Sequence, residues 1–400
     1  MDLRVRLQHP LVVALGANLL ILLGALALSL IPVWSLRAVG GDSLGGGTPA
    51  EDWFFPAAWS PDGSMFATEG PGRFQVAAAD GTILVRNQAG GSPVWVDERT
   101  VLVVRGVDQA SGWLVRVDSR DGRREMVGRP IAPGRLVADG RGHVALWRAY
   151  VDVSTSILDP ADGSVLAHLD GYHAQIWTND GGLILKQRPP GLGYSYPDSG
   201  TLSIWRPGQP PRSLATDLIQ VEDVPVLAPG GDAVTCFCIS RSSAAESQGP
   251  AIYRVPLDGS PATLLTPWAG GNPHAYPGVA WIDDDSIAVV DRYGVFRMSE
   301  GGDPQPMPES PPTQPTPVRR SGRVYHLDGA IIVVTHDTRL DLEAELSVID
   351  DEGRLRFRRR LHAWNPPYLR IDPVHHRALV VTDPNNPGEP SHRLFILEFS

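Results

Sequence analysis

The sequence predicts an all-β protein, a β-propeller of seven or eight four-stranded blades with eight favoured, preceded by one N-terminal transmembrane helix. Three observations lead to this fold class. Strand–turn–strand segments such as residues 59–67 recur along the chain, its 42 glycines and 37 prolines are spread over 400 residues, and helical periodicity is absent after the N-terminus. Many short strands separated by turn residues are typical of small sheets that repeat around a ring.

The first blade shows how the local pattern works. Its first turn is Ser60-Pro61-Asp62-Gly63, in which proline presets φ, aspartate can bond to its own backbone and glycine accepts positive φ. A second hairpin follows over residues 74–85. Four antiparallel strands in so short a span form a meander with two apolar faces, and both faces are buried only when copies of the meander stack side by side.

The N-terminal region carries a long apolar run. Residues 11–33 contain no charged side chain, and as a helix they would extend about 35 Å, which is enough to cross a bilayer. Arg4 and Arg6 precede the run, while Arg37 and then Asp42 follow it. This bias favours a single-pass protein of the cell membrane, with a cytoplasmic N-terminus and an extracytoplasmic body.

The domain boundaries follow from this run. We expect a cytoplasmic tail over residues 1–10, a transmembrane anchor over 11–34, a flexible glycine-rich linker over 35–51 and the propeller over 52–400. A cleaved signal peptide with its small-residue site at Ala25-Leu26-Ala27 is the alternative. The length of the run favours a retained anchor.

Repeats divide the rest of the chain into eight units. Their first strands are expected near residues 57–60, 92–96, 135–138, 174–178, 224–227, 278–282, 322–327 and 368–371. Seven blades stay open as an alternative, because the boundaries of the third and fourth units are indistinct. The last unit has only three strands, so we expect residues 52–55 to add the fourth and to close the ring without a free edge.

Two segments carry a family resemblance. Residues 59–67 (WSPDGSMFA) and 252–266 (IYRVPLDGSPATLLT) resemble the two halves of the TolB-type, WD40-like propeller repeat. The likeness covers the blades and not residues 1–51, and the sequence shows no counterpart of the additional N-terminal domain of TolB. The resemblance implies a propeller outside the cytoplasm that works mainly by binding, and it implies no specifically Tol-like partner.

The connections between strands differ on the two faces of the expected ring. Turns between the first and second strands, and between the third and fourth, share one face and are short. Long insertions fall mostly on the other face, at residues 188–200, 241–250, 301–317, 337–343 and 383–392. Because loops on a rigid scaffold often carry function, we expect this second face to bind a ligand. The alternative is that long loops are merely tolerated there.

Candidate ligand-binding residues stand just before three of the first strands. They are His173, His274 with Tyr276, and His362 with Trp364. Their positions predict a group near the mouth of the axial channel, where neutral imidazoles could bind a metal or act as acid and base. The alternative is that they are repeat-equivalent loop histidines bonded to their neighbours. No residue is assigned to catalysis, to a cofactor or to a metal.

Composition and missing motifs narrow the function classes. A net charge of −10 and a pI near 5.5 disfavour binding of nucleic acid. The sequence has no Gly-x-Ser-x-Gly elbow, no His-Glu-x-x-His helix and no nucleotide-binding glycine motif. These absences count against several enzyme classes, and the enzyme question stays open with a lean towards no activity.

Two further features of the sequence can each be interpreted in two ways. Cys236 and Cys238 are either buried thiols or a metal or redox pair, and a bridge between them would be at the edge of disulfide geometry. The other feature is a cluster of arginines that either protects an exposed strand edge or forms an anion or lipid-headgroup patch. Strand alternation predicts one shared face for four of its five members, Arg354, Arg356, Arg358 and Arg360, with Arg359 on the other.

The function expected from the sequence is non-catalytic binding. The propeller would act as a membrane-anchored scaffold for a protein, a peptide or another cell-envelope component, with residues 11–34 in the membrane. The alternative is a hydrolase or lactonase-like propeller enzyme with a polar or metal site at the channel mouth.

Overall fold

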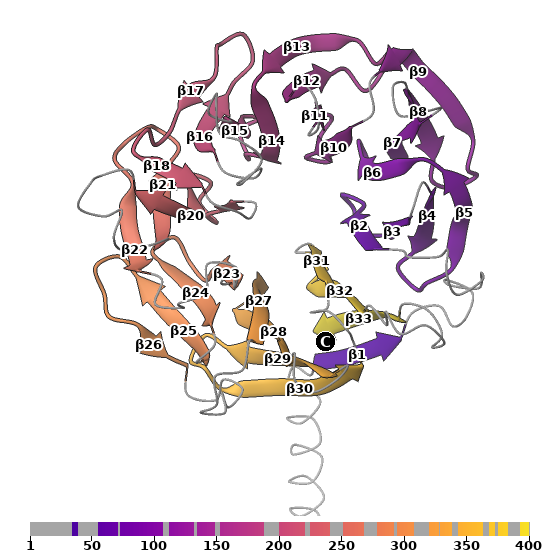
Figure 1. The fold of residues 1–400 in the computed structure, drawn as a ribbon. Helices are drawn as coiled ribbons and strands as arrows, with labels where there is room; N and C mark the ends of the chain where they lie inside the picture. Colours follow the sequence, from indigo (N-terminus) through magenta and orange to yellow (C-terminus); the bar gives the residue numbers. More distant parts are fainter. Residues whose placement is uncertain are drawn as a thin grey trace, which may run out of the picture.

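The computed structural model describes residues 34–38, 55–70, 73–106, 112–131, 134–148, 153–187, 200–220, 225–240, 251–267, 278–291, 294–307, 320–327, 329–337, 343–362, 368–372, 375–382 and 393–399. Their strands form eight sheets arranged as the blades of a ring (Figure 1). This arrangement confirms the all-β propeller and the eight blades that the repeats predict. In each blade the first strand lies nearest the axis and later strands lie farther out.

The first four blades follow one another along the chain, each with its strands in order from the axis outwards. Blade 1 has β2 (Phe55–Trp59), β3 (Met65–Gly70), β4 (Arg73–Ala78) and β5 (Ile83–Ala89). Blade 2 has β6 (Gly91–Trp95), β7 (Thr100–Gly106), β8 (Gly112–Asp118) and β9 (Arg124–Ile131). Blade 3 has β10 (Arg135–Ala138), β11 (Val144–Arg148), β12 (Ser154–Leu158) and β13 (Val165–Asp170). Blade 4 has β14 (Tyr172–Trp177), β15 (Leu183–Gln187), β16 (Thr201–Trp205) and β17 (Arg212–Ser213).

Among the other four blades, the fifth and the eighth depart from this simple strand order. Blade 5 has a divided inner strand, β18 (Leu218–Gln220) and β19 (Val226–Leu227), both paired with β20 (Ala233–Ser240), followed by β21 (Ala251–Pro256) and β22 (Thr263–Pro267). Blade 6 has β23 (Gly278–Trp281), β24 (Ser286–Asp291), β25 (Gly294–Ser299) and β26 (Gln305–Pro306). Blade 7 has β27 (Arg320–Leu327), β28 (Ala330–Asp337), β29 (Glu343–Asp350) and β30 (Leu355–His362). Blade 8 has β31 (Tyr368–Asp372), β32 (Arg377–Thr382) and β33 (Arg393–Phe399), with β1 (Trp34–Ala38) outermost.

Blade 8 is closed by a strand from the other end of the sequence, as expected, but not by the expected residues. β1 pairs antiparallel with β33, from Trp34 opposite Phe399 to Ala38 opposite Phe395. The assignment of residues 52–55 to this role is wrong, because Phe55 instead begins the inner strand of blade 1 and residues 52–54 lie outside the described residues. The predicted linker over 35–51 and the propeller start at 52 therefore also need correction.

The transmembrane anchor stays a prediction. No helix among the described residues is both long and apolar enough to cross a membrane. Residues 11–33, which make up the apolar run, lie outside the described part of the chain.

The core lies between blades, because each sheet buries both of its faces. In β7, Val101 and Val103 pack in a cluster shared with blade 1, while Leu102 and Val104 pack in a cluster shared with blade 3. This follows from the two-residue period of a strand, which sends successive side chains to opposite faces. Full burial of such a side chain contributes about 1.5 to 3 kcal/mol, so a blade depends on its neighbours for much of its stability.

Tryptophans at the end of inner strands connect successive blades. The indole Nε1–H of each donates to a backbone carbonyl oxygen of the preceding blade's inner strand: Trp59 to Arg370 (2.9 Å), Trp95 to Ala58 (3.1 Å), Trp177 to Val137 (3.0 Å) and Trp281 to Val226 (3.0 Å). The sequence contains this signal, since each tryptophan stands directly before the first turn of its blade.

The junction of blades 8 and 1 has further polar contacts. Arg377 stacks over the Trp59 ring, 4.4 Å from its centroid, and its Nε donates to Asp372 Oδ2 at 2.9 Å. A second guanidinium nitrogen of Arg377 donates to the Gly63 carbonyl oxygen in the first turn of blade 1. Asp372 is 2% exposed. The chain ends are therefore joined both by the β1–β33 pairing and by this side-chain cluster.

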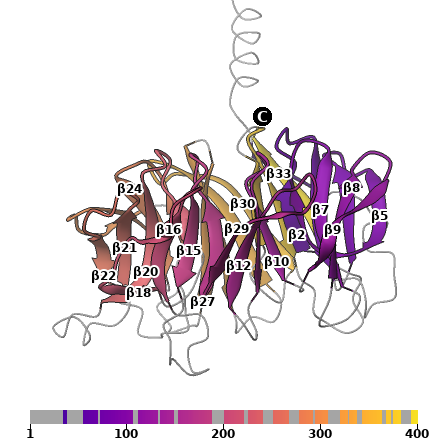
Figure 2. The same cartoon turned by 90° about the horizontal axis from the view of Figure 1, so that it is seen from above.

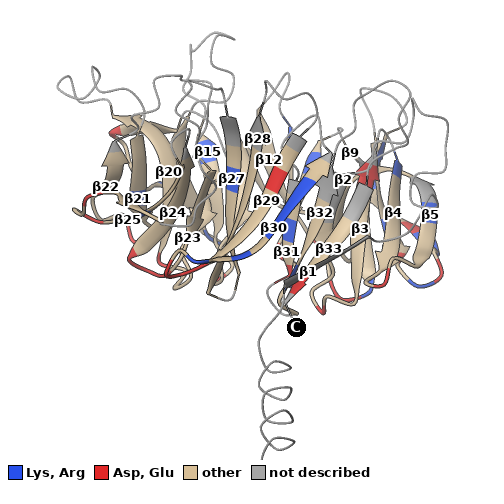
Figure 3. Cartoon of the chain, turned by 90° about the horizontal axis from the view of Figure 1, so that it is seen from below, with Lys and Arg blue, Asp and Glu red and all other residues tan. Residues whose placement is uncertain are grey.

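The two faces of the ring carry different connections. We call the face with the turns between first and second strands and between third and fourth strands the short-turn face, and the opposite face the long-loop face. Figure 2 shows the strands running between the two faces, and Figure 3 shows stretches of the short turns coloured as acidic or basic residues. The strand order places the insertions at 188–200, 241–250, 337–343 and 383–392 on the long-loop face, with interiors outside the described residues. The segment 301–317 differs, because residues 301–304 form the short turn before β26 and only residues 307–317 follow that strand.

Candidate functional site

The residues predicted to bind a ligand are only partly described. His173 lies inside β14, is 6% exposed and stacks on Trp147 with 4.9 Å between ring centroids. His362 is the last residue of β30. His274, Tyr276 and Trp364 lie outside the described residues. Their gathering at the channel mouth therefore stays a prediction, and the buried ring of His173 packs between blades 3 and 4.

Arginines on inner strands are a feature of the channel region that was not predicted from the sequence. Arg135 is in β10, Arg323 in β27 and Arg370 in β31, and all three strands lie next to the axis (Figure 1). Desolvation by surrounding protein lowers the pKa of Arg370 although part of its side chain reaches solvent; nearby Tyr325 opposes this shift and Arg323 adds to it. In the sequence, each of these arginines stands within an expected inner strand, and this position is the feature that could have indicated arginines near the channel.

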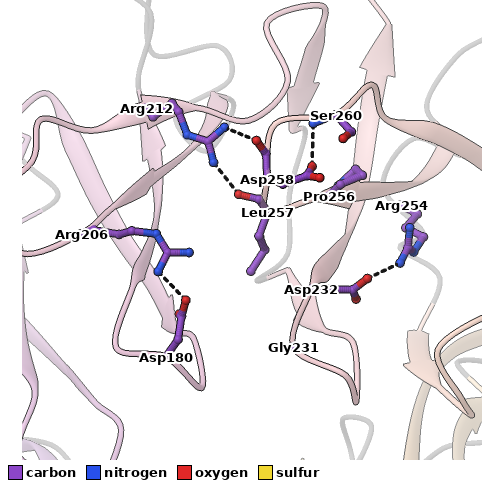
Figure 4. Close-up of a pocket in the computed structure, with 10 residues that line it drawn as sticks. All are labelled: Asp180, Arg206, Arg212, Gly231, Asp232, Arg254, Pro256, Leu257, Asp258 and Ser260. Atoms are coloured by element: carbon purple, nitrogen blue, oxygen red, sulfur yellow. Dashed lines mark hydrogen bonds and ion pairs between the residues drawn. The ribbon is translucent and has the colours of Figure 1, made fainter.

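A pocket of about 450 Å³ opens between blades 4 and 5, and it is formed by turns of the short-turn face. Figure 4 shows charged side chains from both blades around it. The residues that line it are Asp180, Arg206, Arg212, Gly231, Asp232, Arg254, Pro256, Leu257, Asp258 and Ser260. This site was not predicted from the sequence, because it is formed by separate turns of two neighbouring blades that meet only in the folded ring.

The turn between the first two strands of blade 4 holds the carboxylate of Asp180 in place. Asp180 Oδ1 accepts a hydrogen bond from the Thr178 hydroxyl at 2.5 Å, and Gly181 takes the positive φ of 80° that the turn requires. The other oxygen, Oδ2, accepts from Nη1 of Arg206, which follows β16. Local turn chemistry thus places an arginine–aspartate pair at the rim of the pocket.

The same pair recurs in the next two blades. Arg254 in β21 donates from Nη2 to Asp232 Oδ2 at 2.8 Å, and Arg297 in β25 donates from Nη2 to Asp283 Oδ2 at 2.7 Å. In each case an arginine of the third strand reaches the aspartate of the first turn. The pairs of blades 4 and 5 line the pocket, whereas the pair of blade 6 does not.

Arg212 connects the two blades across the pocket. It lies in β17 of blade 4, and its Nη1 and Nη2 donate at 2.5 Å each to the carbonyl oxygens of Asp258 and Leu257 in the third turn of blade 5. A planar guanidinium with two bonds to adjacent carbonyls has a fixed direction. The position of this turn, and therefore the shape of the pocket, is set by the pairing of the blades.

The pocket keeps its charges fixed near neutral pH. The hydrogen bond from Thr178, followed by the ion pair with Arg206, holds the pKa of Asp180 below its ordinary value despite partial burial. The backbone N–H and the hydroxyl of Ser260 lower the pKa of Asp258. Both carboxylates are therefore ionised at pH 7, where arginine is also charged.

One buried polar atom of a pocket residue has no hydrogen-bond partner among the described residues. Nε of Arg254 is buried and makes no hydrogen bond to any described residue, although Nη2 of the same guanidinium is paired with Asp232. A buried donor without an acceptor carries a desolvation penalty. Nε itself is not exposed to the pocket, so a polar ligand would instead be recognised by the oriented charged groups at the pocket surface. Ionised aspartates and arginines are poor proton donors near neutral pH.

The two cysteines form a disulfide. Cys236 and Cys238 in β20 are bonded through their Sγ atoms, with 5.5 Å between their Cα atoms, and both are 1% exposed. They belong to the apolar cluster between blades 4 and 5. The interpretation as two free buried thiols is therefore corrected, since strand alternation places residues i and i+2 on the same face. No group of three metal-ligating side chains occurs in the described part of the chain.

The arginine cluster of blade 7 is paired within its own blade. Arg354 Nε and Arg356 Nη2 contact Asp350 Oδ2 at 2.7 and 2.6 Å, and Arg358 Nε contacts Glu345 at 3.1 Å. The predicted shared face is interrupted by a register shift between Val348 and Ile349 of the neighbouring strand. As a result Leu355 packs towards blade 6, while Phe357 packs towards blade 8.

Comparison with known proteins gives similarity of fold only. No family model and no curated protein matches the sequence. A solved eukaryotic initiation factor aligns with a TM-score of 0.53 at 10% identity and covers 92% of this chain and 93% of its own. The C-terminal WD40 domain of Sif2 aligns with a TM-score of 0.51 at 11% identity, over 87% of this chain and 97% of its own.

A larger peptidase and TolB also align with this chain. A prolyl endopeptidase aligns with a TM-score of 0.51 at 15% identity, over 76% of this chain and 49% of its own, so this chain spans about half the length of that peptidase. TolB from Acinetobacter baumannii aligns with a TM-score of 0.36 at 13% identity, over 75% and 77% of the two chains. At these identities the likeness shows the fold alone: the chain is a β-propeller of WD40-like architecture, with eight blades in the described residues.

Proposed function

We propose that this chain is a membrane-anchored, extracytoplasmic β-propeller that acts as a non-catalytic binding scaffold for a protein, a peptide or another envelope component. The pocket between blades 4 and 5 is the part of the scaffold that we assign to binding. The long-loop face, with the residues predicted from the sequence, is a second candidate surface.

One observation carries this proposal. The pocket brings together charged groups that are oriented by hydrogen bonds and stay ionised at neutral pH. Fixed charges recognise polar groups, while catalysis of proton transfer needs groups that titrate near the working pH. Such a pocket on a rigid ring fits a binding role.

The disulfide supports the proposed compartment. Cys236 and Cys238 are bonded and buried in the core between blades 4 and 5. Disulfides persist in secreted and envelope proteins and are rare in the reducing cytosol of mesophiles. The aligned region makes up only 49% of the prolyl endopeptidase, so the activity of that enzyme is not transferred to this chain.

The experiment compares two arginine variants of the full-length protein. Affinity purification from native membranes, read by mass spectrometry, would identify the companions of the wild type, of Arg254→Ala and of the control Arg297→Ala. The control removes an equivalent arginine–aspartate pair that lies outside the pocket.

We expect a companion that is retained by Arg297→Ala and lost by Arg254→Ala. A later titration of that companion should show binding at least about tenfold weaker for Arg254→Ala, which corresponds to about 1.4 kcal/mol. Equal recovery by both variants would exclude the pocket from the binding surface, and recovery of no specific companion by the wild type would contradict the scaffold role.

A further inference from the structure

We infer that the short-turn face of the propeller lies against the headgroup layer of the membrane that holds the anchor, and that the long-loop face points away from it. This inference rests on the proposed membrane anchor, whose predicted end at residue 34 is moved back to Val33 because Trp34 belongs to β1. It adds an orientation and a lipid contact surface, and both follow from the position and direction of β1.

The direction of β1 fixes where the preceding chain joins the ring. β33 is the third strand of blade 8 and runs from the long-loop face to the short-turn face, where it ends at Phe399. Trp34 is paired with Phe399 and Ala38 with Phe395. β1 therefore starts at the short-turn face, and Figure 3 places the C-terminal end of the chain at this face as well.

The sequence leaves no spacer between the apolar run and the propeller. The apolar segment assigned to the span ends at Val33, and β1 begins at Trp34. Because one residue of extended chain reaches about 3.5 Å at most, the short-turn end of blade 8 lies close to the end of the span. The glycine-rich residues that were expected to act as a tether come after β1, between two strands of the ring, and cannot separate the ring from the membrane.

The charges of this face identify the kind of lipid it would accept. Turn aspartates on four blades have pKa values below the ordinary one. Partial burial of Asp62, Asp283 and Asp350 raises their pKa values, but hydrogen bonds to these carboxylates outweigh this effect. The pKa of Asp162 is lowered mainly by its hydrogen bonds from Ser164. Contiguous acidic residues in these turns, Asp283-Asp284-Asp285 and Asp350-Asp351-Glu352, outnumber the arginines paired with them, and this surplus negative charge would repel anionic headgroups. Covalent attachment therefore imposes the orientation, and zwitterionic headgroups fit the face better than anionic ones.

The orientation has a consequence for the two candidate surfaces. The pocket between blades 4 and 5 belongs to the short-turn face, so its ligand would come from the membrane surface or from a juxtamembrane segment. The long-loop face would instead meet soluble or envelope components on the far side. Partners that contact the two faces can therefore be distinguished by whether they require the membrane.

The test measures the depth of labelled residues. Full-length protein is placed in phosphatidylcholine vesicles with one introduced cysteine at a time, which carries a fluorophore, and lipid with a nitroxide on its headgroup is added as quencher. The two native cysteines are bonded and buried and would not react. Glu352→Cys reports on the short-turn face of blade 7, and Arg360→Cys reports on the same blade towards its long-loop face; both side chains are exposed.

We expect strong loss of fluorescence for the label at 352 and little loss at 360, with the same result in high salt because the orientation is covalent. Ser64→Cys, exposed in the first turn of blade 1, gives a second short-turn position if Glu352→Cys fails to fold. Protein that does not float with the vesicles would refute the anchoring itself. Protein that floats but shows quenching at 360, or equal quenching at both positions, would overturn the orientation while leaving the anchor intact.

Discussion

Gly63 illustrates how closely the blades meet at the scale of single residues. Its φ is 63°, and a Cβ at this position would overlap His375 and Asp372 of blade 8. Positive φ costs an L-residue roughly 1 to 2 kcal/mol, and the overlap adds displacement of the cluster that joins the chain ends. We expect Gly63→Ala to lower the free energy of unfolding by more than about 2 kcal/mol, measured by urea denaturation.

Gly208 provides the control for this substitution. Its φ is 74°, but a Cβ added at this position would meet no described atom within 4 Å. Gly208→Ala should therefore show only the conformational cost of about 1 to 2 kcal/mol. Equal losses for the two variants would mean that Gly63 does not touch blade 8 as described.

Asp180 gives a prediction on pH dependence at the same scale. Its pKa is lowered in the folded state, chiefly by the Thr178 hydroxyl and also by Arg206. A lowered folded pKa contributes stability above the unfolded pKa of about 3.9, and this stability is lost as the pH falls through the folded pKa. We expect wild type to exceed Asp180→Asn in unfolding free energy at pH 7 and the difference to shrink below about pH 4.

The size of this effect is limited by solvent. The Asp180 side chain is 57% exposed, so screening keeps the difference below about 1 kcal/mol. Urea denaturation of both proteins near neutral pH and well below the unfolded pKa is the measurement. A difference that stays constant or grows towards acid would contradict the lowered pKa.

At the scale of strands and blades, the hydrogen bond from a tryptophan Nε1–H to the preceding blade can be tested by a single substitution. Trp95→Phe removes the bond from Nε1 to the Ala58 carbonyl oxygen, and Trp205→Phe makes the same change in volume at a buried tryptophan whose indole nitrogen has no described hydrogen bond. We expect Trp95→Phe to be less stable than Trp205→Phe by about 1 kcal/mol, the usual contribution of one hydrogen bond. Thermal or urea unfolding of both variants decides the question, and equal losses would count against the interblade bond.

The disulfide in β20 is also tested at the element scale. Protein unfolded in denaturant without reductant should take up no thiol reagent, and the same protein after reduction should take up two equivalents, because Cys236 and Cys238 are bonded to each other. Mass spectrometry reads both states. Labelling before reduction of protein taken from its native membrane would contradict the bond and remove its support for the extracytoplasmic location.

How far the sequence predicts each element depends on whether its signal is local. Most inner strands and short turns follow from local turn chemistry, as in Asp62-Gly63 and its counterparts, and they are found where expected. β1 was missed because Trp34 directly follows an uncharged run and looked like the end of the anchor. The pocket was missed because Arg212 and Leu257 meet only when blades 4 and 5 pack, and spacing in the sequence does not report on such contacts.

At the scale of the whole molecule, the ring is closed by the two ends of the chain. A propeller of stacked sheets would leave the edge of β33 unpaired without β1, and an unpaired edge is prone to pairing with other chains. The same strand would hold the short-turn face next to the membrane under the proposed anchoring. Architecture, orientation and the assignment of the two candidate surfaces therefore depend on the β1–β33 pairing.

Amide hydrogen exchange of residues 34–38 and 393–399 in the full-length protein tests this pairing most directly. Paired strands exchange slowly, so both segments should be protected, and Leu36→Pro, which removes an N–H and restricts the backbone opposite Leu397, should abolish the protection of β1 and weaken that of β33. Exchange of residues 34–38 as fast as in an unfolded peptide, with β33 unaffected by Leu36→Pro, would show that the ring is not closed by the N-terminal strand.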